Sequence, residues 1–127
     1  MIEVKALITS TYEQETAVAA RRLVKMGTAA NEVVEATGTD ALIIGISNEA
    51  ASDTADDLVG IVMAGTAALS ILSASTKGGA ITGTTDGKGL VTTTQNQYCV
   101  GWLLETTTVA SEIAAVLVNP FLYPTVT

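Results

Sequence analysis

The chain has 127 residues, carries a net charge of −7 and holds only 15 % charged residues, against roughly 25 % in an ordinary soluble domain. The length fits one domain with a substantial core. The acidic balance excludes direct binding to nucleic-acid phosphates, which requires clustered Lys and Arg, so no nucleic acid is expected as a partner. A surface poor in charge favours burial against other proteins, and we expect an oligomer or a component of an assembly.

Three features of the sequence indicate the cellular compartment of the protein. Glu3 and Lys5 interrupt the N-terminus before any apolar region, which is unlike a signal peptide. The longest weakly polar run, residues 59–72, is shorter than the roughly 20 residues of a membrane-spanning helix. The single cysteine, Cys99, excludes an intrachain disulfide and fits a reducing cytoplasm. We therefore expect a soluble protein made in the cytoplasm, without a membrane partner.

The first segment, residues 1–16, is expected to form an N-terminal arm. Ile2, Val4 and the pair Leu7 and Ile8 alternate loosely with polar residues, as in a strand that adds to a neighbour's sheet edge. A short helix over residues 11–26 competes with this interpretation, because Thr11 and Gln14 have the spacing of a capping box. Helix and strand both stay open for residues 11–26.

The middle of the chain, residues 17–118, is expected to form the β-rich domain. Short runs dominated by Val, Ile and Thr are separated by Gly, Asn and Asp every 8–12 residues or so, which is typical of an antiparallel β-sandwich or barrel. The predicted strands lie in residues 21–27, 32–38, 40–50, 58–65, 89–94, 97–105 and 112–120. Residues 63–75 fit either a helix or a strand.

The glycine-rich stretch 78-GGAITGTT-85 resembles a phosphate-binding loop in its glycine spacing. That loop requires Lys after the second Gly and a helix behind it, but Thr84 stands there and further Gly and Thr residues follow. Asp86-Gly87 between two Thr/Val-rich runs is a hairpin signal. We predict a turn rather than a nucleotide site.

A weak internal echo links two parts of the sequence. The stretch 43-IIGISNEA-50 resembles 99-CVGWLLET-106, and each is followed by an apolar run, 58-LVGIVM-63 or 113-IAAVLV-118. This pattern indicates a strand–loop–strand unit used twice, with chance similarity as the alternative. Gly45 and Gly101 then mark a bulge or a close backbone approach.

The sequence contains few residues that could take part in catalysis. The chain has no His, which excludes a Ser-His-Asp hydrolase and makes a zinc site improbable. The acidic residues of 51–57 lack the order of a calcium loop and fit a solvated loop. Glu49 and Glu105 could form a glycosidase pair, but strand-end carboxylates explain them. Cys99 fits a buried small side chain. No enzymatic activity, metal or cofactor is expected.

Several motifs, taken in order, resemble one protein family. They are 21-RRLVKMG-27 with 33-VVEATG-38, 42-LIIGISNEA-50, 58-LVGIVMAGTAAL-69, 76-TKGGAITGTTDGKGLVTTT-94, 99-CVGWLLET-106 and 112-EIAAVLV-118. Together they resemble the small capsid decoration, or cement, proteins of tailed double-stranded DNA phages. Gly78-Gly79 departs from the Gly-Asp that is usual in that family.

The resemblance implies a mainly β protein on the outside of the icosahedral head. It would bind as a homotrimer to the major capsid protein of the expanded shell, clamp neighbouring subunits against the pressure of packaged DNA, and need no cofactor. The tail of residues 119–127 is the first candidate for the contact, with Pro120, Phe121, Leu122 and Tyr123 as contact residues, and the N-terminal arm is the second. The alternative is that the tail folds back on its own domain. Trp102, in an apolar strand, is expected in the core. The alternatives are a tail, fibre or other polymerising β-module, and a soluble ligand-binding barrel.

Overall fold

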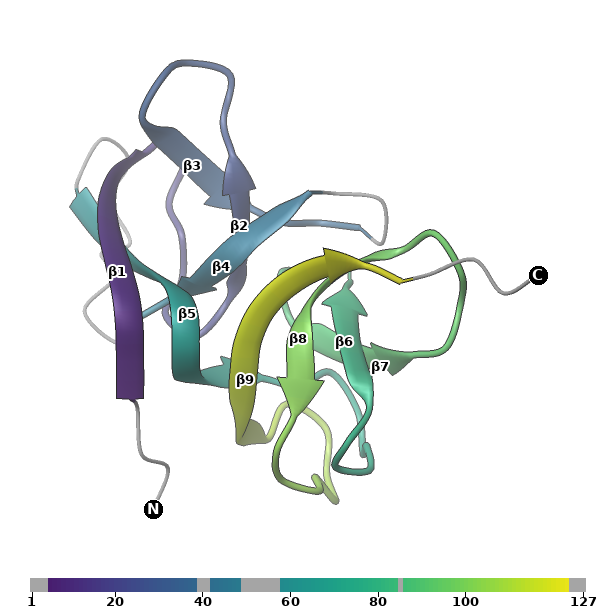
Figure 1. The fold of residues 1–127 in the computed structure, drawn as a ribbon. Helices are drawn as coiled ribbons and strands as arrows, with labels where there is room; N and C mark the ends of the chain where they lie inside the picture. The colour runs from purple at the N-terminus through teal and green to yellow at the C-terminus, as the bar shows by residue number, and fades with distance from the viewer. Residues whose placement is uncertain (1–4, 39–41, 49–57, 85, 124–127) are drawn as a thin grey trace.

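The computed structural model describes residues 5–38, 42–48, 58–84 and 86–123. This part of the chain contains nine strands and no helix, which confirms the mainly β fold (Figure 1). In chain order the strands are β1 (Lys5–Gln14), β2 (Leu23–Met26), β3 (Glu32–Glu35), β4 (Ile43–Ser47), β5 (Leu58–Ser70), β6 (Ala80–Gly83), β7 (Gly89–Thr92), β8 (Tyr98–Leu103) and β9 (Ile113–Leu122).

Within the described residues, the structure decides between the two alternatives left open for residues 11–26. Residues 11–26 contain no helix, because β1 runs to Gln14 and pairs along its length with β5, from Lys5–Thr66 to Glu13–Leu58. This long-range pairing outweighs the local capping pattern, whose contribution is only about 1 kcal/mol. The expected arms are likewise strands of the sheet over most of their described length. Residues 5–14 form β1, and β9 extends through Leu122, where it pairs with Tyr98 of β8.

Strands β1 to β5 form a closed barrel. The order is β1-β3-β2-β4-β5, and the pairing of β1 with β5 closes the ring. The β1–β3 pair, at Gln14 and Val33, is parallel, so the expectation of a wholly antiparallel sheet is wrong at this point. The interior is a cluster of five buried residues, namely Val18, Val24, Val33, Val59 and Ile61.

The second half of the molecule repeats this arrangement around the same strand. The C-terminal part of β5 continues into β9, β8, β6 and β7. Ile71, directly after β5, forms a parallel bridge with Gly89 of β7. The second ring is therefore closed in the same way as the first, and β5 serves both as the last strand of the first barrel and as the first strand of the second.

The pairing register shows that the two barrels are structural repeats. Between β2 and β4 the pairs are Leu23–Ile46, Val24–Gly45 and Lys25–Ile43, and between β6 and β8 they are Ala80–Trp102, Ile81–Gly101 and Thr82–Cys99. Between β1 and β5 the pairs Glu13–Leu58 and Thr9–Val62 correspond to Ser70–Ile113 and Thr66–Leu117 between β5 and β9. The internal echo in the sequence is confirmed, and the repeated unit comprises five strands rather than two.

The echoed glycines lie at equivalent bulges, as predicted. In the first barrel the bulge lies where β4 pairs with β2, beside Gly45. In the second barrel it lies where β8 pairs with β6, beside Gly101. A Cβ added at Gly45 would lie 2.3 Å from the Val62 carbonyl oxygen, and one at Gly101 would lie 1.7 Å from that of Leu117. Both glycines are therefore required by the close approach of a neighbouring strand.

The glycine-rich stretch forms the β6–β7 hairpin. Gly83 pairs with Gly89 across it, and Gly87 adopts φ 76° in the turn, as the hairpin prediction required. Residues 80–83, which were not predicted as a strand, form β6 because their small and β-branched side chains are buried between β7 and β8.

The two barrels share one apolar core. Side chains on neighbouring positions of a strand point to opposite faces, so Leu23 and Val62 point out of the first barrel, whose interior holds Val24 and Ile61. Leu23, Ile43, Ile46 and Val62 are buried in the same cluster as the interior of the second barrel. Strand β4 lies against β8 and β9, so the outer face of the first barrel packs over the second.

Candidate functional site

The residues considered for catalysis do not form a site in the described part of the chain. Glu105 is exposed, and its carboxylate accepts a hydrogen bond of 2.8 Å from the Ala115 amide, which is a strand-end role. Its suggested partner, Glu49, and the acidic residues 51–57 lie outside the described residues. Cys99 is buried as expected, and burial raises the pKa of its thiol to about 11. The thiol is therefore protonated at neutral pH and is a poor nucleophile.

Neither metal-binding clusters nor spanning helices occur among the residues that the structure describes. In these segments no three His, Cys, Asp or Glu side chains come together as a metal site would require. The same segments contain no helix long and apolar enough to cross a membrane.

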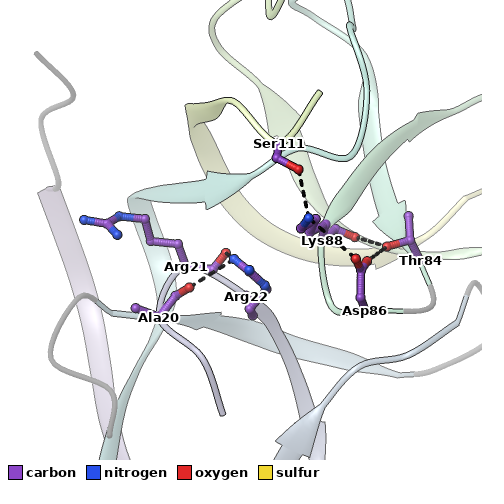
Figure 2. A network of polar contacts seen from close by, with 7 residues as sticks. All are labelled: Ala20, Arg21, Arg22, Thr84, Asp86, Lys88 and Ser111. Atoms are coloured by element: carbon purple, nitrogen blue, oxygen red, sulfur yellow. Dashed lines mark hydrogen bonds and ion pairs between the residues drawn. The ribbon is translucent and has the colours of Figure 1, made fainter. Parts of the chain in front are cut away.

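A polar network holds the β6–β7 turn in place (Figure 2). Lys88 Nζ donates a hydrogen bond of 2.8 Å to Ser111 Oγ and lies 3.6 Å from Asp86 Oδ2. The Thr84 hydroxyl lies 2.9 Å from both Asp86 Oδ1 and the Lys88 carbonyl oxygen. The hydroxyl of Thr84, and then the charge of Lys88, lower the pKa of Asp86. These contacts fix a turn rather than offering charge to a ligand.

The same turn joins the two barrels. The Leu23 amide donates a hydrogen bond of 2.8 Å to the carbonyl oxygen of Gly87. The neighbouring Arg22 guanidinium donates to the carbonyl oxygen of Ala20 at 3.3 Å, so it is held against its own backbone (Figure 2). Basic side chains in this region therefore serve the internal structure.

The predicted N-terminal contact residues are exposed where the structure describes them. Leu7 and Ile8 have 82 % and 56 % of their surface exposed, at a bulge in β1. Ile2 and Val4 lie outside the described residues. Exposing large apolar side chains to water is unfavourable, by about 1.5–3 kcal/mol each relative to full burial. The pair is therefore a candidate protein-binding surface.

The predicted C-terminal contact residues are only partly available. Pro120 and Leu122 are exposed, whereas Phe121 and Tyr123 are half-buried because β9 continues along β8. The rings of Phe121 and Tyr123 lie 6.5 Å apart. The structure thus places two of the four residues on the surface and two against the sheet.

A second apolar surface lies beside them and was not predicted. We define the β8–β9 face as Trp102, Leu117 and Phe121. Trp102 and Leu117 are paired across the two strands and have 38 % and 42 % of their surface exposed. The Trp102 ring stacks on Phe121 at 5.0 Å between centroids. The expectation that Trp102 belongs to the core is wrong, because its strand turns this position outward.

One signal in the sequence could have located this face. The internal echo aligns Gly45-Ile46 with Gly101-Trp102, so both side chains point out of their barrels, and each is buried only if another part of the structure covers it. Ile46 is buried because the second barrel covers it, and no third barrel follows Trp102 in the described chain.

Comparisons with known proteins bear on the fold. No family model matches the sequence, and no curated protein matches it. Among solved structures the chain is similar to the head fiber gp8.5 N base of bacteriophage phi29, with a TM-score of 0.69 and 14 % sequence identity. The match covers 88 % of this chain and 93 % of that chain. At this level of identity the likeness establishes a shared fold.

Proposed function

We propose that the chain is a structural protein of a phage head that binds the outside of the expanded shell as a decoration protein. Its partners would be the major capsid protein and further copies of itself, in a trimer. It would clamp neighbouring capsid subunits and stabilise the head against internal DNA pressure. The protein would be made in the host cytoplasm and end on the capsid exterior.

One observation carries this proposal. Nearly the whole double barrel, 88 % of the chain, superimposes on a protein that forms the base of a phage head fiber. A fold alone does not determine function. The site adds support, since the described residues offer exposed apolar side chains and a buried, protonated thiol rather than a catalytic arrangement.

The surface at Leu7 and Ile8 is the candidate contact with the shell. These residues lie near one end of the β1–β5 ladder, whose first pair is Lys5–Thr66. Two side chains of this size give weak affinity by themselves. A trimer that engages several capsid subunits makes each later contact intramolecular, so weak single contacts combine into tight binding.

Binding to shells tests the proposal. The wild-type chain is titrated onto expanded, DNA-free shells of the phage that encodes it, and bound copies per shell are counted after sedimentation. We expect saturation near the copy number of the major capsid protein. A double variant, Leu7→Ser with Ile8→Thr, should reach half-saturation at a concentration at least about 30-fold higher, as for the loss of a hot-spot contact.

The matched control is Leu58→Ser. Leu58 is 63 % exposed and lies at the other end of the same ladder, opposite Glu13, so this variant should bind like the wild type. Failure of the folded wild-type protein to sediment with shells would overturn the decoration role. Equal binding by the double variant would remove the Leu7–Ile8 surface from it.

A fibre base is the second candidate, because the similar solved structure is described as part of a head fiber. It would occupy few positions per shell or polymerise, instead of covering the shell. Electron microscopy of saturated shells separates the two, since decoration gives density at every local three-fold position and a fibre base gives sparse projections.

A further inference from the structure

Because the two barrels are repeats, the same surface occurs twice in the molecule, once on each barrel. The two surfaces lie in different environments. In the first barrel, four of the positions that point outward on β2, β4 and β5 are buried in the core shared with the second barrel. They are Leu23, Ile43, Ile46 and Val62, each at most 2 % exposed. This contact lies between two copies of one structural unit, and the side chains that form it at these four positions are apolar.

In the second barrel the equivalent positions are Ala80, Cys99, Trp102 and Leu117. Ala80 and Cys99 are buried, and Phe121 of β9 pairs with Cys99 and stacks on Trp102. Trp102 and Leu117, which replace the fully buried Ile46 and nearly fully buried Val62, are 38 % and 42 % exposed. At Trp102 and Leu117, therefore, the surface that is covered in the first barrel is exposed in the second.

The opposite side of this contact is also less buried in one of the two barrels. In the second barrel Val100 and Val118 belong to the same buried cluster as Leu23, Ile43, Ile46 and Val62, and they are 0 % and 2 % exposed. Their equivalents in the first barrel are Ile44 and Met63, which are only partly buried. The Tyr12 hydroxyl lies 4.0 Å from the Met63 sulfur at this place. We call Ile44 and Met63 the β4–β5 mouth.

We propose that a second copy of this chain docks its β4–β5 mouth onto the β8–β9 face, so that the copies associate head to tail. The contact continues between molecules the packing that joins the two barrels within one molecule. A stacked Trp and Phe pair provides a large, rigid apolar surface, and a Met opposite it adapts its shape to fill gaps. The interface is heterologous, so it closes into a ring or continues as a filament.

Sedimentation velocity of the full-length chain, without shells, tests this proposal separately from any capsid binding. We expect association that increases with protein concentration, and a shift of the association curve by at least about 30-fold for Trp102→Ser or Leu117→Ser, as for interface hot spots. Leu58→Ser is the control with a similarly exposed leucine and should associate like the wild type. Circular dichroism establishes that each variant is folded.

Cross-linking tests the polarity of the contact. In a Cys99→Ala background, a Leu117→Cys chain and a Met63→Cys chain are mixed and treated with a short bis-maleimide. Head-to-tail docking predicts cross-links between the two different variants, and few when either is treated alone. Like-with-like cross-links through Leu117→Cys would overturn the head-to-tail arrangement. A wild-type chain that stays monomeric, or face variants that associate normally, would overturn the proposal.

Discussion

Gly101 on β8 lies directly against the backbone of β9. A Cβ at this position would be 1.7 Å from the Leu117 carbonyl oxygen and 2.9 Å from its carbon. Both atoms belong to the backbone, so no side-chain rotation can make room. Gly45 has the same relation to Val62 in the first barrel, at 2.3 Å. The recurrence of glycine follows from the bulge that each barrel requires.

Replacing Gly101 by Ala should therefore destabilise the fold strongly. We expect Gly101→Ala to lower the free energy of unfolding by about 3 kcal/mol or more, because β9 must move away from β8. Gly78→Ala is the control, since nothing lies within 4 Å of its Cβ and only its φ of 93° opposes the change. Arg21, its equivalent in the first barrel, tolerates φ 59° with a side chain.

The control should cost only about 1 kcal/mol, the order of the left-handed backbone penalty. Urea denaturation measures both variants. A loss of stability for Gly101→Ala no greater than that for Gly78→Ala would show that β8 and β9 adjust freely to the added methyl group.

At the scale of the elements, β5 organises the molecule. Val59 and Ile61 line the first barrel, whereas Val62, Ala67 and Leu69 belong to the cluster of the second, and Gly65 between them adopts φ 107°. Burial along β5 alternates at its start, but Ile61 and Val62 are both buried and residues 67–70 are buried in succession, because one face of the strand borders the first interior and the other face borders the second. That is why residues 63–75 fit a helix or a strand equally well in the sequence.

The equivalent residues Val62 on β5 and Leu117 on β9 should contribute differently to the free energy of unfolding. Val62→Ala should cost about 2–3 kcal/mol, from two buried methyl groups and the cavity they leave. Its equivalent, Leu117→Ala, should cost less than about 1 kcal/mol, because the side chain is exposed in the single molecule. Denaturation at high dilution, where copies do not associate, gives both values. Equal losses would contradict the different environments of the two positions.

Most strands could be predicted from their sequences, and two could not. Residues 43–47 and 98–103 carry long apolar runs bounded by turn residues, so β4 and β8 are visible locally. Strand β6 is only Ala-Ile-Thr-Gly, and its burial follows from its pairing with β7 and β8 rather than from an apolar pattern of its own. Strand β1 shares its residues with a capping pattern, and only its pairing with β5 decides between them.

At the scale of the whole molecule, local sequence patterns could not predict that the strands close into two rings. The β1–β5 and Ile71–Gly89 pairings join residues far apart in the chain, and no periodicity encodes them. For the candidate site, Leu7 and Ile8, which the sequence suggested as contact residues, are exposed, and their role in binding stays a prediction. The exposure of Trp102 was not predicted, since an apolar strand position is buried or exposed according to whether another repeat covers it.

The shared core predicts that both barrels unfold together. Trp102, the single tryptophan, reports on the second barrel by fluorescence, while circular dichroism reports on all strands. We expect the two transitions to coincide in urea, because Leu23, Ile43 and Ile46 belong to the same cluster as the second interior. Val62→Ala should shift both signals by the same amount. Fluorescence and circular dichroism transitions at different urea concentrations would instead show two independent units.

The strand common to both barrels also has a mechanical consequence. Domains that are joined by a linker pivot about it, whereas here β5 is hydrogen-bonded to β1 on its first half and to β9 on its second (Figure 1). A pull applied to one barrel passes into the other through continuous backbone and two ladders of hydrogen bonds. We therefore expect the two barrels to move as one rigid body. Tension between them would be resisted by all the ladder hydrogen bonds along β5 together.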